Sequence, residues 1–172
     1  VGADVCDWTP PDRPVAACFA FPPCTHLAGS GARWWKDKGL QPLIDGLRVV
    51  EACRRICTDS GAPWMLENPV GWLSSRWREP DHSFDPCDFA GWADEPHAEA
   101  YTKRTHLWTG GGFVFPYRRW VEPTLGSLFH STPPSSDRGD LRSVTPQGFA
   151  RAVYDANAPA LRDALLAKEA ER

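Results

Sequence analysis

Two short apolar runs, each ended by polar residues and proline, define the pattern of this chain. The first covers seven apolar residues, 15–21, and stops at two prolines, which cannot continue a hydrogen-bonded ladder. The second covers 62–66 and is followed by Glu67, Asn68 and another proline. Apolar runs of this length, bounded by turn residues, predict two buried strands.

A helix is predicted between these strands, over 40–59, with Gly61 as a typical stop. Apolar residues recur there at helical spacing, at Leu40, Leu43, Ile44, Leu47, Val50, Cys53, Ile56 and Cys57. A strand, a helix and a strand in this order predict a parallel pair whose carboxyl ends lie on one side of the sheet. Ligands of open α/β sheets bind beyond those ends, so Cys24 and Glu67 become candidate site residues.

The rest of the chain predicts fewer regular elements. Residues 72–100 are predicted as irregular loop with one short strand over 83–89, and 104–109 as a strand that Gly110 to Gly112 ends. Residues 131–137 are rich in Ser, Pro and Asp and predict a linker. A helical segment follows over 145–170, with a break predicted at Pro159.

Composition places the chain among globular domains. Its 172 residues are 42% hydrophobic and 24% charged, which predicts one domain over 1–172. No apolar run approaches the roughly 20 residues that span a bilayer, so we expect no membrane contact and a cytoplasmic location. The net charge of −3 means that any basic surface for nucleic acid must be local.

The cysteines predict reduced thiols rather than a metal or disulfide framework. The six of them contain no CxxC pair, and neither they nor the five histidines have zinc-site spacing, so no metal is expected. Two interpretations of Cys24 stay open on this basis, a nucleophile or a small buried hydrophobic residue after a turn. Glu67 is likewise compatible with a site carboxylate or a capping carboxylate in a turn.

Three stretches in a fixed order carry a family resemblance. They are Pro22-Pro23-Cys24, extended through Lys38, then Glu67-Asn68-Pro69, and then Thr102 to Trp108. Together they resemble the cytosine-5 DNA methyltransferases, and in particular the small phage-type members. The resemblance runs from about Asp4 to Trp108 and more weakly from Arg142 to Asn157. It implies an α/β fold with a Rossmann-like parallel sheet, flanking helices, and the first strand–helix units missing.

The resemblance also implies roles for individual residues. Cys24 would be the catalytic nucleophile that adds to carbon 6 of a flipped cytosine in DNA, and Glu67 would donate to ring nitrogen 3. Arg104 would contact the base carbonyl or a phosphate. Further residues on the substrate side would be Pro23, Thr25, Trp34, Trp35, Asn68, Lys103 and Thr105. For the two tryptophans, stacking on the base and packing in the core stay equally open.

The implied methyl donor is S-adenosylmethionine. By resemblance its binding would involve Asp4, Pro22, Ser143 and Thr145. The glycine-rich turn that holds such a cofactor belongs to units that would precede Val1, and Gly110 to Gly112 lead into 113–116 rather than a helix. We therefore expect a missing segment or a second chain to carry that turn.

Two alternatives to this function remain from the sequence. One is a pyrimidine-modifying enzyme on the same scaffold that uses another one-carbon donor or acts on a free nucleotide. The acidic net charge and the short 113–128 segment, too short for a DNA-reading domain, suit that alternative. The other is a non-catalytic remnant that binds nucleic acid.

Overall fold

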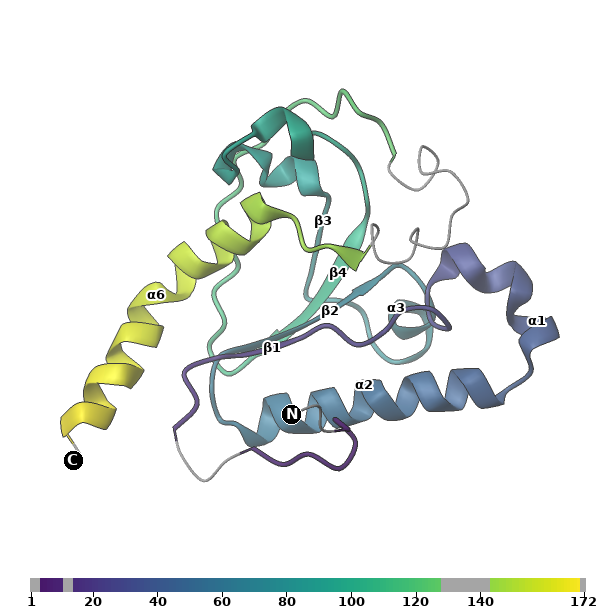
Figure 1. Cartoon of the computed structure of the whole chain (residues 1–172), viewed down its shortest axis with the longest axis horizontal. Helices are drawn as coiled ribbons and strands as arrows, with labels where there is room; N and C mark the ends of the chain where they lie inside the picture. Colours follow the sequence, from purple (N-terminus) through teal and green to yellow (C-terminus); the bar gives the residue numbers. More distant parts are fainter. Residues whose placement is uncertain (1–3, 11–13, 128–142, 171–172) are drawn as a thin grey trace. The chain divides into compact units, whose positions relative to one another are not determined.

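A computed structural model describes residues 4–10, 14–127 and 143–170. They form a mixed α/β structure with one four-stranded sheet, in the order β1-β2-β4-β3 (Figure 1). The strands are β1 (Cys18–Ala20), β2 (Trp64–Pro69), β3 (His82–Phe84) and β4 (Thr105–Gly110). β1 and β2 run parallel, as the sequence predicts, whereas β4 runs antiparallel to β2, so the sheet is mixed.

β1 is shorter and less buried than its apolar run predicts. Only three of the seven residues form ladder pairs, with Ala20 opposite Leu66. The side chains alternate across the sheet, so Ala20 is buried while Phe19 and Phe21 are 43% and 47% exposed. The expectation of a buried strand therefore holds for the face that carries Ala20 and was wrong for the face that carries Phe19 and Phe21.

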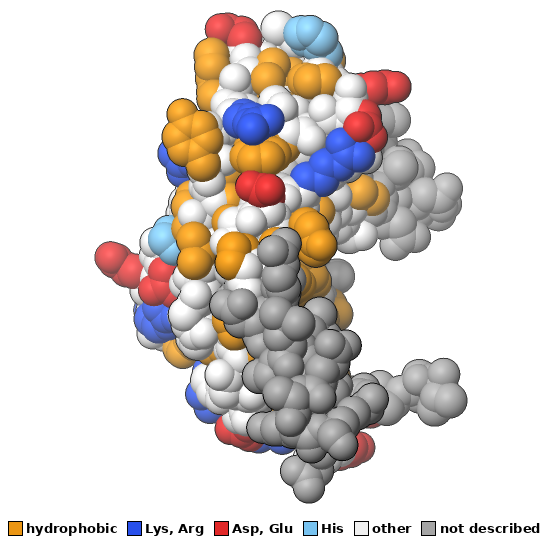
Figure 2. Space-filling view, turned by 90° about the vertical axis from the view of Figure 1, so that its left-hand side faces the viewer, with side chains coloured by type: hydrophobic (Ala, Val, Ile, Leu, Met, Phe, Trp, Pro, Cys, Tyr) orange, Lys and Arg blue, Asp and Glu red, His pale blue; other side chains and the backbone are white. Residues whose placement is uncertain are grey.

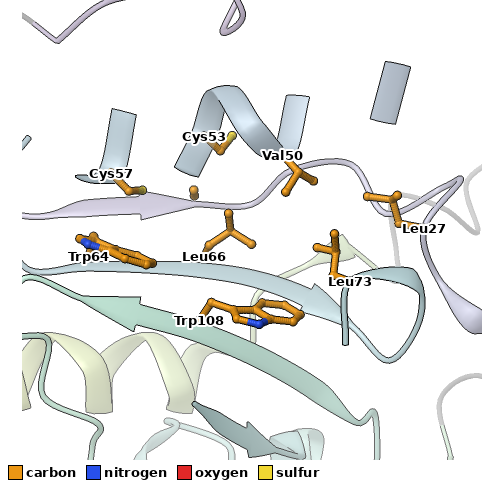
Figure 3. Close-up of a cluster of buried hydrophobic side chains, with 9 residues drawn as sticks. Leu27, Val50, Cys53, Cys57, Trp64, Leu66, Leu73 and Trp108 are labelled. Atoms are coloured by element: carbon orange, nitrogen blue, oxygen red, sulfur yellow. The ribbon is translucent and has the colours of Figure 1, made fainter. Parts of the chain in front are cut away.

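The predicted crossover helix is present as α2 (Gln41–Asp59). Pro42 lies in its first turn, where its missing N–H costs nothing, and Gly61 follows its end with a φ of 63° that suits glycine. One side of α2 is apolar and packs on β1 and β2 (Figure 3). The strand–helix–strand prediction is thus confirmed.

The core between α2 and the sheet combines residues from several helices and strands. Figure 3 shows side chains of α2 directed toward β1, with those of β2 and β4 beneath. The cluster consists of Ala20, Leu27, Val50, Cys53, Cys57, Trp64, Leu66, Leu73 and Trp108. Leu66 and Trp108 are opposite one another in the β2–β4 ladder and are fully buried, so this pair links β2 and β4 within the core.

Contacts divide the chain into two compact units. The first comprises 1–83, 105–113 and 159–172, and the second 84–104 and 114–158. The second unit has an aromatic core in which Phe84 stacks on Phe149 at 4.1 Å between ring centroids and Phe89 meets both edge-on. Asn157, 2% exposed, accepts a hydrogen bond from the Val114 amide and donates one to its carbonyl. The expectation of a single domain over 1–172 stays a prediction.

Several short helices complete the described structure. Between β1 and α2 lie η1 (Gly29–Trp34) and α1 (Trp35–Lys38). The segment 72–100, predicted as irregular loop, contains α3 (Trp72–Arg76), η2 (Pro86–Asp88), η3 (Ala90–Trp92) and η4 (Pro96–Glu99). The short strand predicted over 83–89 is β3, which begins and ends earlier. The predicted linker 131–137 lies outside the described residues.

The C-terminal segment is one helix, α6 (Gln147–Ala170), rather than two. Pro159 was expected to break it, because proline removes one helical hydrogen bond and crowds the preceding turn. The helix nevertheless continues through this position. At its start, the Glu99 carboxylate accepts hydrogen bonds from the amides of Gln147 and Gly148, which satisfies two donors of the first turn.

The core between α2 and the sheet leads to a stability prediction. Leu66→Ala should lower the free energy of unfolding by about 2–5 kcal/mol, because it removes buried methyl groups and leaves a cavity. Urea unfolding followed by tryptophan fluorescence measures this change. Leu40→Ala, at a side chain that is 74% exposed, is the control and should change the value by less than about 0.5 kcal/mol. Equal losses in both variants would contradict the assigned core.

Candidate active site

A buried hydrogen bond joins the ends of β1 and β2. The side-chain amide of Asn68 donates to the carbonyl oxygen of Pro22 at 3.1 Å, and Asn68 is only 1% exposed. The parallel register explains this contact, because Ala20 lies opposite Leu66 and each strand then advances by two residues. The carboxyl ends of the two strands therefore meet, as the sequence predicts.

Cys24 and Glu67 are near neighbours in the chain of the two residues that this hydrogen bond joins. Cys24 follows Pro22 by two residues, which span at most about 7 Å of chain. Glu67 precedes Asn68 in β2, and the alternation of the strand turns it to the sheet face opposite α2. Both side chains are half-buried and both make polar or electrostatic interactions. The structure thus brings the predicted nucleophile and carboxylate to the same end of the sheet.

The Cys24 loop is held by backbone hydrogen bonds. The Cys24 carbonyl accepts from the amides of Leu27 and Ala28, at 2.9 and 2.8 Å, which closes a tight turn around Thr25. The Leu27 carbonyl in turn accepts from the Trp72 amide at 2.7 Å. These backbone hydrogen bonds therefore hold the segment that carries Cys24 against the start of α3.

Gly71 permits the close approach of the two loops. An added Cβ at Gly71 would lie 2.1 Å from the Leu27 carbonyl oxygen and 2.7 Å from the Gly29 nitrogen. Gly29 donates to the Val70 carbonyl at 2.8 Å, and Ala28 forms an isolated bridge with Gly71. The segments after β1 and β2 therefore pack backbone against backbone, which only glycine allows at this position.

Three buried polar atoms in this region lack a hydrogen-bond partner among the described residues. They are Asn68 Oδ1, His26 Nδ1 and Trp35 Nε1. Each belongs to the tip of β2 or to the segment between β1 and α2. A buried polar group without a partner costs about 1–3 kcal/mol, and a polar ligand that completes its hydrogen bonds would remove that cost.

The remaining substrate-side predictions in the first unit are mostly at the surface. Pro23 and Thr25 are exposed, and Trp34 is 51% exposed, with the Arg33 guanidinium 5.0 Å from its ring centroid. Trp35 is half-buried. Thr105 is buried at the start of β4, opposite Pro69.

Four predicted residues belong to the second unit, and their place relative to Cys24 stays a prediction. Arg104 forms an ion pair with Asp85, with 3.2 Å between nitrogen and oxygen, and the adjacent Lys103 is half-buried. Ser143 and Thr145 are exposed near the start of α6. Of the other expected cofactor residues, Asp4 accepts a hydrogen bond from the Cys6 amide, and Pro22 is buried with its carbonyl bound by Asn68.

Charges of both signs are interspersed on the face shown in Figure 2, where Lys and Arg side chains lie beside Asp and Glu. Several surface arginines have acidic partners, such as Arg78 with Asp81 at 2.8 Å and Arg151 with Asp94 at 2.6 Å. The hydrogen bonds from Arg78 hold the pKa of Asp81 below its usual value. The surface around these ion pairs therefore carries charges of both signs rather than a basic field.

Two further findings concern the described part of the chain. It contains no cluster of three or more His, Cys, Asp or Glu side chains able to hold a metal ion. Among its helices, none combines the length and the apolar character needed to cross a membrane.

Comparisons with models of known families, with curated proteins and with solved structures found no match. The local geometry at the ends of β1 and β2 is therefore the basis for the function proposed below.

Two residues of the site were missed by the sequence analysis. His26 lies in the turn after Cys24. Its position two residues after the proposed nucleophile is the sequence feature that could have indicated it as a site residue. Gly71 follows Glu67-Asn68-Pro69-Val70, but a lone glycine after a strand gives no indication of which backbone it approaches. Only the contact between the two loops in the folded structure shows that Gly71 permits their close approach.

Substitution of Gly71 tests the contact between the loops. Gly71→Ala should lower the free energy of unfolding by about 1–3 kcal/mol, because the new methyl group collides with the Leu27 carbonyl. The measurement is urea unfolding. Gly31→Ala is a matched control in the same loop region, since its Cβ would meet only the Thr25 carbonyl at an ordinary 3.8 Å. A Gly71 variant as stable as the control would contradict the backbone packing of the two loops.

Proposed function

We propose that this chain is the catalytic part of a DNA cytosine carbon-5 methyltransferase with Cys24 as its nucleophile. The observation that supports this most is the buried hydrogen bond from Asn68 to the Pro22 carbonyl. It joins the Pro-Cys and Glu-Asn segments on which the family resemblance rests. The parallel β1–α2–β2 unit is compatible with part of a Rossmann-like sheet, which belongs to the same proposal.

The proposed chemistry begins with the thiol of Cys24. Carbon 5 of cytosine is a weak nucleophile, and addition of a thiolate to carbon 6 gives it enamine character. Glu67 donates a hydrogen bond or a proton to ring nitrogen 3, which offsets the charge that the addition places on the ring. Asn68 has a positioning role, since its amide holds the Pro22 end of the Cys24 loop.

The target base must leave the duplex before Cys24 can reach carbon 6. Trp34, half-exposed beside the Arg33 guanidinium, offers a ring for stacking together with a positive charge for phosphate. In this proposal Arg104 contacts the base carbonyl or a phosphate, which requires it to exchange its ion pair with Asp85 for the new partner.

The described residues do not fit the implied cofactor, S-adenosylmethionine. β1 leads into two prolines instead of a glycine-rich turn, and the positive-φ pair Gly111 and Gly112 after β4 leads into an irregular segment. The Pro22 carbonyl already accepts a hydrogen bond from Asn68. We therefore derive no step through the cofactor, and its binding by a further segment or a second chain is part of the proposal.

A second candidate is an enzyme that acts on a free pyrimidine nucleotide with the same Cys24 and Glu67. The net charge of −3 and the mixed charges of the face in Figure 2 favour it, because duplex DNA binding usually involves a basic surface. Both candidates share the addition to carbon 6, so one experiment tests the common step and the choice of substrate.

The common step predicts hydrogen exchange at carbon 5 without any methyl donor. When Cys24 adds to carbon 6, carbon 5 can take a solvent proton, and reversal of the addition then releases its original hydrogen. The chain should therefore release tritium from DNA that contains cytosine labelled at carbon 5. Cys24→Ser should reduce the rate by about 100-fold or more, since the hydroxyl is a far weaker nucleophile at neutral pH.

Cys6→Ser is the matched control, a half-buried cysteine outside the proposed site, and should keep the wild-type rate. Release from labelled DNA but not from the labelled nucleotide supports the methyltransferase, and the reverse supports the second candidate. No release from either substrate would overturn both and favour a non-catalytic nucleic-acid-binding chain. Calorimetric titration with S-adenosylmethionine then determines whether this chain binds the donor alone.

A further inference from the structure

A pair of cysteine thiols outside the proposed site lies in direct contact. Cys18 in β1 and Cys57 in the last turns of α2 are 39 residues apart in sequence, with 3.3 Å between their sulfur atoms. Cys57 is completely buried, whereas Cys18 is half-buried. Figure 3 shows Cys57 on the side of α2 that faces β1. The function proposed above uses neither thiol.

The two thiols are chemically unequal. The hydrogen bond between the two thiols lowers the pKa of Cys18, and the same hydrogen bond, together with burial, raises the pKa of Cys57. The thiolate is the form that reacts with oxidants, so Cys18 is the member that reacts first. Its partial exposure admits a small oxidant, and its partner is already within contact distance.

We propose that Cys18 and Cys57 are a modification site at which a peroxide forms a reversible disulfide between β1 and α2. The sulfur atoms must approach from 3.3 Å to the bonded distance of about 2.05 Å. A displacement of this size lies within the reach of side-chain rotation and a small shift of a three-residue strand.

The reaction has two balanced steps. The Cys18 thiolate attacks one oxygen of hydrogen peroxide, the O–O bond breaks, and Cys18 becomes a sulfenic acid while the peroxide leaves as hydroxide and takes up a proton to form water. The Cys57 sulfur then attacks the Cys18 sulfur. The S–O bond breaks, and the hydroxyl leaves with the Cys57 proton as a second water. Two thiols and one peroxide thus give one disulfide and two waters.

The test is thiol counting after oxidation of the full chain. The protein is exposed briefly to hydrogen peroxide, the peroxide is removed with catalase, and the remaining thiols are alkylated in denaturant. We expect two of the six thiols to be protected, a crosslinked peptide that joins Cys18 to Cys57, and recovery of all six after dithiothreitol. Six alkylated thiols after oxidation, or a crosslink between other cysteines, would overturn the proposal.

Variants assign the pair and the order of events. Cys57→Ala should abolish the crosslink and leave a sulfenic acid on Cys18 that dimedone captures. Cys53→Ala is the matched control, because Cys53 is also buried and lies one helical turn earlier on the same helix. It should form the crosslink as the wild type does. A crosslink lost in the control to the same extent as in Cys57→Ala would contradict the assignment.

Cys18→Ser gives an independent arm at the more exposed position, in case the buried substitution unfolds the chain. It should retain five alkylated thiols after oxidation, the six of the wild type less the one replaced. Tritium release by Cys24 reports on the proposed function separately. The disulfide can therefore form in a chain that lacks the proposed activity, and its absence says nothing against that activity.

Discussion

The hydrogen bond between the Asn68 amide and the Pro22 carbonyl is the interaction on which the candidate site depends. Both groups are buried, so removal of either one would leave the other without a hydrogen-bond partner, because water does not reach it. Parallel pairing of β1 and β2 makes this hydrogen bond possible, because it places the carboxyl ends of the two strands side by side. The bond then fixes the start of the loop that carries Cys24 relative to Glu67.

Packing and polarity have separate parts in this region. Leu66 and Trp108 fill the space under α2 and hold the strands in register, while Gly71 lets the loops touch through their backbones. The buried polar atoms without partners among the described residues belong to Asn68 in β2 and to His26 and Trp35 between β1 and α2. The packed residues thus adjoin buried polar atoms that lack hydrogen-bond partners. A ligand that completes those hydrogen bonds would gain binding energy from them.

β1 links the proposed nucleophile to the proposed disulfide pair. Its first residue, Cys18, touches Cys57 in the core, and its carboxyl end leads to Cys24. Burial and the neighbouring thiol separate the reactivities of Cys18 and Cys57, whereas the position of Cys24 follows from backbone turns. The pairing of this one short strand with β2 therefore supports both the proposed nucleophile and the proposed modification site.

Local pattern alone determined much of this arrangement. Helical spacing and prolines predicted α2, β2 and the meeting of the carboxyl ends of β1 and β2, because these depend on periodicity and on residues that end strands. Tertiary structure decided what sequence could not encode locally. Four features depend on how elements distant in sequence pack together. They are the antiparallel direction of β4, the exposure of Phe19 and Phe21, the continuation of α6 through Pro159, and the contact between Cys18 and Cys57. Contacts between residues distant in sequence leave no period in the chain, so only the folded packing reveals them.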